Sequence, residues 1–433
     1  MNNNIQKYTT YKPSGVEWLG EIPEHWKALH NKYIFRLKKN LVGKKSHLYE
    51  LLSLTLFGVI KRDMENPQGK FPAEFDTYQE VKKGDFIFCL FDVEETPRTV
   101  GLSEFDGMIT GAYTVFDVNK SFDRKFLYYF YLNLDNGKRM KPLYTGLRNT
   151  ISKDNFFAFR TLIPPLSEQT RIAEFLDRKT AQIDQAVTIK EKQIALLKER
   201  RQILIHRAVT RGINPDVKLK PSGVEWIGDI PEHWEVIKTK FASEFIYDGT
   251  HGSYPRVETG FRLLSVRNII EDNFVFRDDD SRISEKHFKE ISNKFLVSNG
   301  DIQLAIVGAT LGKVAIVENL IEPIVTQRSV CTIRANNVCL TKFIFYFIKS
   351  EPFQNYLWLN AGFSAQPGVY LGTIQNSYLT RPPLMEQEQI VNYIKDISKK
   401  IATAIKLKEQ EIEKLKEYKS TLINSAVTGK VRV

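Results

Sequence analysis

The sequence is poor in cysteine and has no long hydrophobic run. Cys89, Cys331 and Cys339 are its three cysteines among 433 residues, and they have neither the spacing of zinc ligands nor the density of a disulfide scaffold. We therefore expect reduced, buried thiols. The most apolar runs, such as 126–134, are far too short to span a bilayer, and residues 1–5 carry no apolar signal core. These absences argue against a secreted disulfide-rich protein and a membrane protein, so we expect a cytoplasmic chain.

Ordered catalytic motifs are also missing. Residues 308–314 resemble a phosphate-binding loop, but the spacing is one residue short and no Ser or Thr follows Lys313, so a turn between strands is favoured. The proline pairs 164–165 and 382–383 lack the flanking residues with which amino-methyltransferases grip a flipped base. Neither a Gly-x-Ser-x-Gly elbow nor a His-Glu-x-x-His pair occurs, and nothing orders the acidic run 278–280. We expect no catalytic and no metal-binding residues.

Acidic residues are outnumbered by basic ones. The chain has 62 lysines and arginines against 51 aspartates and glutamates, a formal net charge of +11. This excess favours a polyanionic partner such as nucleic acid, although it also serves solubility. With 42% hydrophobic and 26% charged residues the composition is that of a folded protein, and the length predicts two or more domains.

The sequence does contain a long amphipathic segment, 166–211, which is repeated 218 positions later at 384–429. Apolar residues recur in both at steps of three, four and seven, the pattern of a coiled-coil-like helix. The matching positions are Ile172, Leu176, Ile183, Val187, Ile194, Leu197 and Leu204 in the first segment, and Ile390, Ile394, Ile401, Ile405, Ile412, Leu415 and Leu422 in the second. The pattern predicts two helices, each roughly 65 Å long, that pack together.

A second repeat precedes each globular segment. The stretch Pro-Ser-Gly-Val-Glu-Trp-Leu-Gly-Glu-Ile-Pro-Glu-His-Trp at 13–26 recurs at 221–234 with only two conservative changes. Its prolines, glycines and apolar residues predict a rigid loop pinned by tryptophans, which we call the clasp. His25 and His233 have no acid or nucleophile nearby in sequence, so a structural role is favoured over catalysis.

The segments between the repeats predict two α+β domains that share an outline but few residues. Landmarks such as Gly-Asp at 84–85 and 300–301 are kept. The predicted strands are 51–57, 85–91, 113–118, 262–266, 301–307 and 314–317, and the predicted helices are 124–134 and 343–349.

If the two long helices pack antiparallel, the end of the chain lies near its start. The molecule is then a ring of two equivalent halves with an approximate two-fold axis, a symmetry that duplex DNA backbones share. The expected domains are 1–161 with its clasp at 11–26, the first long helix at 162–215, 216–380 with its clasp at 221–234, and the second long helix at 381–433.

Polar loops in both domains suit nucleic acid. Direct readout of bases uses Arg or Lys toward guanine and Asn or Gln toward adenine, beside residues that contact the backbone. A solvated loop is the alternative for each of them. The candidates are Lys44, Lys45, Ser46, Arg98, Thr99, Arg148 and Asn149 in the first domain, and Thr250, His251, Ser253, Arg267, Asn268, Gln327, Arg328 and Gln366 in the second.

The ordered, repeated motifs resemble the DNA-specificity subunit of type I restriction-modification systems. The resemblance covers nearly the whole chain, although the two domains match only in outline. It rests on the two clasps, on Pro-Pro-Leu-x-Glu-Gln at 164–169 and 382–387, on Ala-Val-Thr-x-Gly at 208–212 and Ala-Val-Thr-Gly at 426–429, and on Asp-Gly-Thr-His-Gly at 248–252.

This resemblance implies two target-recognition domains, each reading one half of a split, asymmetric DNA sequence, with the helices as a ruler between them. Two methyltransferase subunits carrying S-adenosylmethionine would dock on the helices and clasps, and two restriction subunits using ATP and Mg would complete the complex. Methylation would fall on an adenine flipped into the partner's pocket. The chain itself would hold no cofactor.

Two other interpretations remain open at this point. The chain is alternatively a two-headed scaffold whose loops bind protein or RNA, with the positive charge serving only solubility. A third possibility is that the chain is itself a nuclease or methyltransferase with an unrecognised site. Neighbouring genes for an adenine methyltransferase and a helicase-nuclease would favour the first interpretation.

Overall fold

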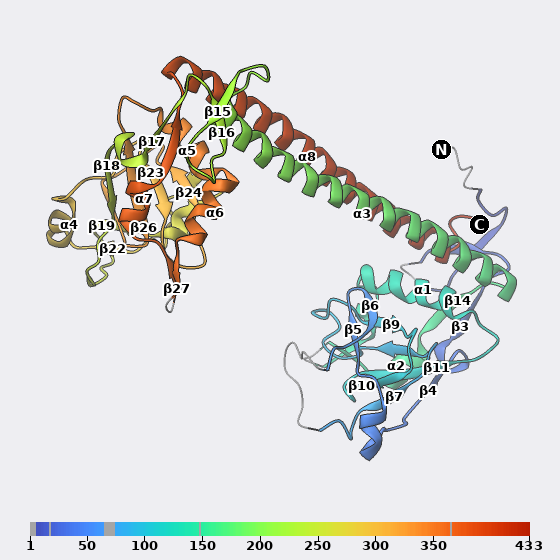
Figure 1. Cartoon of the computed structure of the whole chain (residues 1–433). Coiled ribbons are helices and arrows are strands. Elements are labelled where there is room, and N and C mark those ends of the chain that lie inside the picture. The colour runs from blue at the N-terminus through green and yellow to red at the C-terminus, as the bar shows by residue number, and fades with distance from the viewer. Residues whose placement is uncertain (1–5, 17–18, 65–73, 147–148, 364–365) are drawn as a thin grey trace. The chain divides into compact units, whose positions relative to one another are not determined.

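The computed structural model describes residues 6–16, 19–64, 74–146, 149–363 and 366–433 (Figure 1). The chain divides into two compact units. Unit 1 comprises Met1–Lys190 with Glu409–Val433, and unit 2 comprises Glu191–Lys408. Each unit holds one sheet-rich domain, called here head 1 and head 2, and part of both long helices. No helix in the described ranges is long and apolar enough to cross a membrane.

The two long helices are α3 (Leu166–Arg211) and α8 (Leu384–Val427). In unit 1, Lys190 of α3 forms an ion pair with Glu411, and Asp184 forms one with Lys419 at 2.7 Å. Earlier residues of α3 thus face later residues of α8, so the helices pack antiparallel. None of the predicted seam residues is exposed, which confirms the predicted phase of both helices.

Head 1 is built on an antiparallel sheet with strand order β4-β11-β8-β9, against which α1 packs. Its core is a cluster of aromatic rings that includes Phe35, Phe88, Tyr131 and Phe156. The elements of the sheet are β4 (Phe35–Leu37), β11 (Thr114–Val118), β8 (Phe86–Phe88), β9 (Val100–Leu102) and α1 (Arg124–Asn136).

Short paired strands and one more helix surround this sheet. They are β1 (Tyr11–Pro13) with β2 (Glu21–Pro23), β3 (Lys27–His30) with β14 (Arg160–Ile163), β5 (Leu52–Thr55) with β6 (Gly58–Lys61), β7 (Gln79–Val81) with β10 (Gly107–Ile109), β12 (Tyr144–Thr145) with β13 (Thr150–Ile151), and α2 (Lys153–Ala158).

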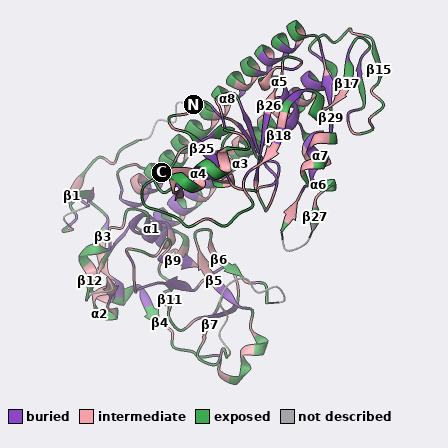
Figure 2. Cartoon of the chain, turned by 90° about the vertical axis from the view of Figure 1, so that its left-hand side faces the viewer, coloured by how far each residue is buried: buried purple, intermediate pink, exposed green. Residues whose placement is uncertain are grey.

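Head 2 has a larger sheet of order β18-β26-β23-β24-β21-β20, and a second sheet of order β22-β19-β25. Buried residues concentrate in these sheets and on the inner faces of the helices (Figure 2). The strands are β18 (Ser243–Asp248), β26 (Val330–Ala335), β23 (Ile302–Ala305), β24 (Val314–Ile316), β21 (Asn273–Phe274), β20 (Ile269–Ile270), β22 (Arg282–Ile283), β19 (Phe261–Leu264) and β25 (Ile324–Thr326).

The remaining elements of unit 2 are three strand pairs and four helices. They are β15 (Leu219–Pro221) with β16 (Asp229–Pro231), β17 (Glu235–Lys238) with β29 (Tyr378–Arg381), β27 (Gly362–Phe363) with β28 (Pro367–Gly368), α4 (Glu285–Ser292), α5 (Thr341–Lys349), α6 (Glu351–Leu359) and α7 (Leu371–Asn376).

The two heads share a common frame despite their different sequences. The order β18-β26-β23-β24 in head 2 matches β4-β11-β8-β9 in head 1. The Gly-Asp landmarks precede the matching strands β8 and β23. Asp85 accepts hydrogen bonds from Lys38 Nζ and from the Lys82 amide, while Asp301 accepts them from Arg334 and from the Ser298 amide. The predicted mixed α+β fold is confirmed, and each predicted strand and helix of the heads contains an element of that kind.

Candidate nucleic-acid interface

The first clasp is fastened to the start of α3 through Glu168. This carboxylate is buried, accepts a hydrogen bond from Trp26 Nε1 at 3.1 Å, lies 2.8 Å from His25 Nε2 and accepts another from the Tyr8 hydroxyl. Burial raises the pKa of Glu168, but the hydrogen bonds from Tyr8, His25 and Trp26 outweigh it and hold the pKa below its usual value. The acid beside His25 is therefore engaged in holding the clasp.

The second clasp repeats the arrangement at the start of α8. Glu386 accepts a hydrogen bond from Trp234 Nε1 at 3.0 Å and lies 2.8 Å from His233 Nε2. Both Trp26 and Trp234 are fully buried, as expected for tryptophans that pin a loop. The histidines thus have acidic partners about 140–150 positions away in the chain, which local sequence did not reveal.

Each clasp also meets the end of the other long helix. Gly212, after α3, has a φ of +75°, and a Cβ there would lie 3.3 Å from both Glu386 and Trp234. Gly429, after α8, has a φ of +71°, and a Cβ there would lie 2.3 Å from Pro23. Glycine is needed for the left-handed turn at both helix ends and for the close approach of Pro23. Nearby, the Arg432 amide donates to the Gln6 carbonyl at 2.8 Å, so both ends of the described chain lie together within unit 1, as predicted.

Gln169 and Gln387, which follow Glu168 and Glu386, attach each head to the start of a long helix. Gln169 accepts a hydrogen bond from the Asp123 amide at 2.9 Å, and Gln387 accepts one from the Leu340 amide at 2.8 Å. Asp123 and Leu340 are the residues that begin α1 and α5. Both glutamines are buried and also donate to the carbonyl of the first proline before the helix. The Glu-Gln pair of the repeated motif therefore holds the clasp with one side chain and the head with the other.

Head 1 has a cavity of about 980 Å³ where β4 and β8 end and β11 begins. Apolar, polar and basic side chains line it together, with Phe91 and Tyr113 stacked at 6.2 Å between ring centres. Lys39, Gln79 and Lys153 belong to this lining and were not among the sequence candidates. A possible signal was the basic pair 38–39 directly after a strand.

The predicted residues of head 1 fall in three different places. Asn149 is next to the cavity-lining residue Thr150 and has a φ of 44°. Arg98 pairs with the buried Asp135 at 3.1 Å, and Thr99 is fully buried beside it. Lys44, Lys45 and Ser46 lie on a short 3-10 helix, Gly43–Leu48, with both lysines exposed. Arg148 lies outside the described residues. Among the described candidates of head 1, none lines the cavity itself, and Asn149 is the sequence neighbour of a lining residue.

In head 2 the structure brings several predicted loops together. The Thr250 amide donates to the Thr326 carbonyl at 2.8 Å, the Arg328 amide donates to the Thr250 carbonyl at 3.0 Å, and the Gln327 amide donates to the Leu264 carbonyl at 2.8 Å. A Cβ on Gly249 would lie 2.1 Å from the Thr326 carbonyl oxygen, so glycine permits this close approach. The exposed candidates of this cluster are His251, Ser253 and Arg328.

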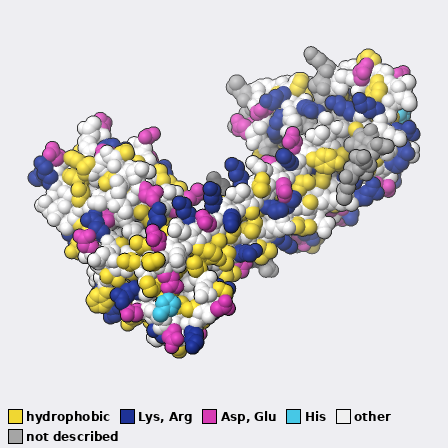
Figure 3. Space-filling model, turned by 90° about the horizontal axis from the view of Figure 1, so that it is seen from above, with side chains coloured by type: hydrophobic (Ala, Val, Ile, Leu, Met, Phe, Trp, Pro, Cys, Tyr) yellow, Lys and Arg dark blue, Asp and Glu magenta, His cyan; other side chains and the backbone are white. Residues whose placement is uncertain are grey.

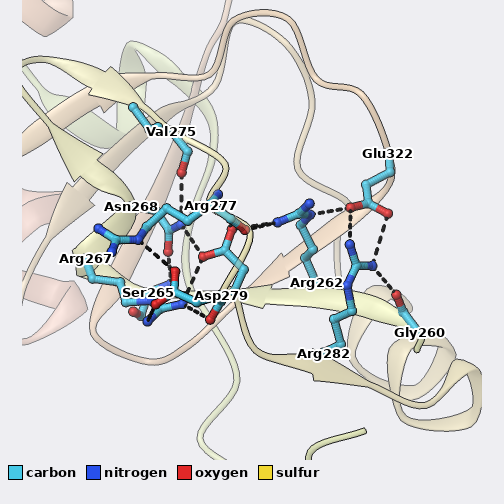
Figure 4. Close-up of polar contacts among 11 residues, drawn as sticks. Gly260, Arg262, Ser265, Arg267, Asn268, Val275, Arg277, Asp279, Arg282 and Glu322 are labelled. Atoms are coloured by element: carbon cyan, nitrogen blue, oxygen red, sulfur yellow. Dashed lines mark hydrogen bonds and ion pairs between the residues drawn. The ribbon is translucent and has the colours of Figure 1, made fainter. Parts of the chain in front are cut away.

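Arg267 and Asn268 lie in a network of arginines and carboxylates (Figure 4). Asn268 has no exposed surface, and its amide donates to Asp280 at 2.8 Å and to the Val275 carbonyl at 2.9 Å. Arg267 pairs with Asp279 at 3.1 Å and with Asp280 at 3.2 Å. Burial raises the pKa of Asp280, but hydrogen bonds led by the Arg277 amide outweigh it and lower the pKa. Contact between Asn268 and a base would require this loop to open.

The same network engages two carboxylates of the acidic run 278–280. Asp279 and Asp280 are neutralised by arginines, and Arg262 and Arg282 share Glu322. Across the described ranges, no group of three or more His, Cys, Asp and Glu side chains is arranged to hold a metal ion.

Gln366 stands beside a hairpin that has a counterpart in head 1. The Val369 amide donates to the Ile306 carbonyl at 3.0 Å, and in head 1 the Ile151 amide donates to the Leu90 carbonyl at 2.8 Å. Ile151 and Val369 differ by 369 − 151 = 218 positions, the same interval as the long helices. By this interval Gln366 corresponds to Arg148. The nearby residues 308–313 form the predicted turn between the paired strands β23 and β24.

Comparison with known proteins gives one family. The family model for the type I restriction modification DNA specificity domain matches residues 100–199 and 250–416. The specificity subunit of type I restriction enzyme MjaVIII from Methanocaldococcus jannaschii is 27% identical over 320 residues, which cover 73% of this chain and 72% of that protein. The EcoBI specificity subunit from Escherichia coli is 26% identical over 253 residues, covering 54% and 50% of the two chains.

Solved structures share the fold. A chain from a study of complex assembly and conformational transition of the type I R-M system has a TM-score of 0.66 at 14% identity, covering 94% of this chain and 98% of that one. The HsdS subunit from Thermoanaerobacter tengcongensis has a TM-score of 0.54 at 14% identity, covering 95% and 98%.

Proposed function

The chain belongs to the family of DNA-specificity subunits of type I restriction-modification systems, and we propose that its two heads each read one half of a bipartite, asymmetric DNA target. It is the non-catalytic subunit of such a system. The observation that supports two half-sites is a contrast between the clasp contacts, which recur in both units, and the heads, which differ. The hydrogen bond from a clasp tryptophan to the glutamate of a long helix recurs in both units, whereas the exposed loops at the matching sheet ends differ in residues.

In head 1 the proposed reading surface is the cavity at the end of β4 and β8. Exposed Lys39 and Lys153 supply charge for DNA phosphates, and Gln79 and Asn149 supply amides for base edges. Tyr113 and Phe91 add an aromatic wall. We give Lys44 and Lys45, on the 3-10 helix that follows Leu41 at the rim, a supporting role toward phosphates.

In head 2 the proposed reading surface is the cluster of loops around Thr250 and Gln327. Backbone hydrogen bonds hold these loops together, so their side chains are positioned before DNA binds. Arg328 is exposed and suits guanine, Gln327 suits adenine, and His251 and Ser253 suit the backbone. Arg267 is held by Asp279 and Asp280, which orients its guanidinium.

The long helices are continuous and have a fixed length, as a spacer needs. α3 and α8 are continuous over 46 and 44 residues, and each contributes residues to both units. A helix of this length has a fixed rise of about 1.5 Å per residue. We propose that the helices set the number of base pairs between the half-sites.

We further propose the partners. Methyltransferase subunits carrying S-adenosylmethionine dock on the helices and clasps, and restriction subunits that use ATP and Mg complete the assembly, with two copies of each. Leu196, Ile203 and Leu407 support a docking face because more than half of each side chain is exposed. Hydrophobic side chains are visible between charged ones along the helices (Figure 3).

Modified-base sequencing of genomic DNA tests this function. DNA from cells with and without the gene is compared, and the expected result is a split adenine-methylation motif that disappears on deletion and returns on complementation. Because the enzyme subunits remain encoded in the deletion strain, the comparison isolates the specificity subunit. An unchanged methylation pattern would contradict the proposal, and a contiguous motif would contradict two separate half-sites.

A further inference from the structure

Unit 2 contains a basic cavity of about 270 Å³ where head 2 meets the long helices. Its walls come from α3, α8, α5 and the edge of the sheet near β21 and β24. Four of the side chains lining it are cationic and two are acidic. The cations are Arg201, Lys342, Lys349 and Lys395, and the acids are Asp272 and Glu318.

The corresponding position in unit 1 is filled by carboxylates of the protein itself. Asp177 accepts hydrogen bonds from Tyr129 at 2.8 Å and from Lys125 at 2.5 Å, which joins α1 of head 1 to α3. About two turns further along α3, Asp184 pairs with Lys419 of α8 at 2.7 Å. Asp177 neutralises a lysine where head 1 meets α3, and Asp184 neutralises a lysine between the two long helices.

The repeat identifies the matching residues of unit 2. Matching positions in the two long helices differ by 218. Matching positions in the head helices α1 and α5 differ by 217, the interval between Asp123 and Leu340, which are bound by the matching residues Gln169 and Gln387. The head-helix residues Lys125 and Tyr129 thus correspond to Lys342 and Tyr346, and the long-helix residues Asp177, Asp184 and Lys419 correspond to Lys395, Ala402 and Arg201.

The charge at this junction is therefore reversed in unit 2. Two carboxylates are replaced by Lys395 and Ala402, while the cations that they would neutralise are kept as Lys342 and Arg201. Within the described ranges Arg201 and Lys395 form no ion pair with a carboxylate, and Arg201 Nε is buried without a hydrogen-bond partner. Arg201 is half-buried and its Nε is a buried donor without an acceptor, which is costly, whereas Lys395 is exposed and adds its charge to the lining of the cavity.

Two acids reduce this excess only in part. Lys349 pairs with Asp272 at one side of the cavity. Lys342 lies 3.8 Å from Glu318, and both side chains are more than half exposed, so the pair is weak. No carboxylate in the described ranges pairs with Arg201 or Lys395, so the lining keeps an excess of positive charge.

We propose that this cavity binds a compact oxyanion of phosphate size, which replaces the Asp177 carboxylate of unit 1. Lysine and arginine side chains from α3, α5 and α8 approach such an ion from different elements, and the Tyr346 hydroxyl is available as a further donor. The bound ion holds α5 of head 2 to the long helices, as Asp177 holds α1 of head 1. The site is independent of the DNA-reading surfaces.

Thermal unfolding and isothermal titration of the full chain with inorganic phosphate test the site, at ionic strength matched with chloride. The expected result for the wild type is saturable binding of one phosphate per chain and a rise in Tm of roughly 3 °C near saturation. Lys395→Asp restores the unit 1 arrangement, so it should raise Tm without phosphate and abolish the response to phosphate. Lys399→Asp, at an exposed position of α8, makes the same charge change and should leave the phosphate response intact.

A second variant keeps the test interpretable if Lys395→Asp does not fold. Lys395→Ala removes one cation without adding an acid and should weaken phosphate binding about tenfold. Acetate, tested in parallel, should bind more weakly than phosphate. Absence of saturable phosphate binding by the wild type, or full binding by both Lys395 variants, would overturn the proposal. Neither outcome bears on DNA recognition, which is measured separately by the methylation motif.

Discussion

The two junctions between clasp and helix are nearly the same, whereas the two heads that they hold are not. Glu168 and Glu386 each accept a hydrogen bond from a clasp tryptophan and lie 2.8 Å from a clasp histidine. The heads share the order of four strands but differ in size, in the second sheet of head 2 and in the residues of the exposed loops. The repeated contacts therefore fasten the heads, and the differing loops are where we propose that two different half-sites are read.

The two units also differ in the charges of the residues where the head meets the long helices. Unit 1 has Asp177 where its head meets α3 and Asp184 between the two long helices, whereas unit 2 has Lys395 and Ala402 at these positions. A repeat can thus preserve the geometry of a contact while reversing its charge. The predictions below alter the fastenings first and the reading loops next.

The largest expected effect comes from shortening both long helices together. Deleting one heptad from α3 and the facing heptad from α8 removes about 10 Å of helix, close to three base pairs of duplex DNA. The methylation motif should keep both half-sites and lose about three base pairs of its gap, with methylation of the original target abolished. Deleting the heptad from α3 alone mismatches the seam and should prevent folding, which makes it the control. An unchanged gap would refute the role of the helices as spacers.

The next effect concerns the fastening of the clasps. Glu168→Ala leaves Trp26 Nε1 buried without an acceptor and removes the partner of Tyr8 and His25, so we expect a loss of ~3 kcal/mol in the free energy of unfolding of unit 1. Glu386→Ala should cost less, ~1–2 kcal/mol, because the Glu386 side chain is 23% exposed against 8% for Glu168.

Urea unfolding followed by tryptophan fluorescence measures both losses. Glu174→Ala and Glu388→Ala, at exposed positions of the same helices, are the matched controls and should change stability little. Equal losses for Glu168→Ala and Glu386→Ala would show that burial does not distinguish the two clasps.

A smaller and more local effect is expected in the reading loops. Arg328→Ala should weaken binding of the assembled complex to its target about tenfold and relax one position of the second half-site. Lys153→Ala in head 1 should weaken binding to all sequences and reduce its salt dependence, because we assign it to a phosphate. Fluorescence anisotropy at several salt concentrations and the methylation motif measure the two effects, with Lys286→Ala on the exposed face of α4 as the control. Relaxation of the first half-site by Arg328→Ala would contradict the assignment of one half-site to each head.

Local patterns made much of the fold predictable. The seam residues of α3 and α8 follow from apolar periodicity, and the clasps follow from a repeat that only two substitutions interrupt. Strands such as β8 and β11 follow from short apolar runs next to glycine. Each of these signals lies within about fifteen residues of chain or is repeated in it.

Contacts between distant residues were not predictable in the same way. The partner of Trp26 is 142 positions away, and nothing near His25 points to Glu168. Asn268 has the residue type of a base reader, yet its side chain is satisfied by Asp280 and Val275, which a sequence pattern cannot show. The cavity of head 1 is formed where β4 and β8 end and β11 begins, so its lining residues become neighbours only in the fold.

The smallest expected effect is a pH dependence at the first clasp. Hydrogen bonds from Tyr8, His25 and Trp26 outweigh burial and keep the pKa of Glu168 below its ordinary value of 4.5. A carboxylate whose pKa is lower in the folded protein contributes stability above the unfolded pKa, and this contribution is lost as the pH falls through the folded pKa. The wild type should therefore lose stability below about pH 4.5 more steeply than Glu168→Gln, which has no proton to take up. Tyr8→Phe removes one donor to the carboxylate and should give an intermediate slope in chemical unfolding between pH 6 and pH 3. Identical slopes for all three proteins would mean that the clasp is held by packing of its tryptophan and not by the charge of Glu168.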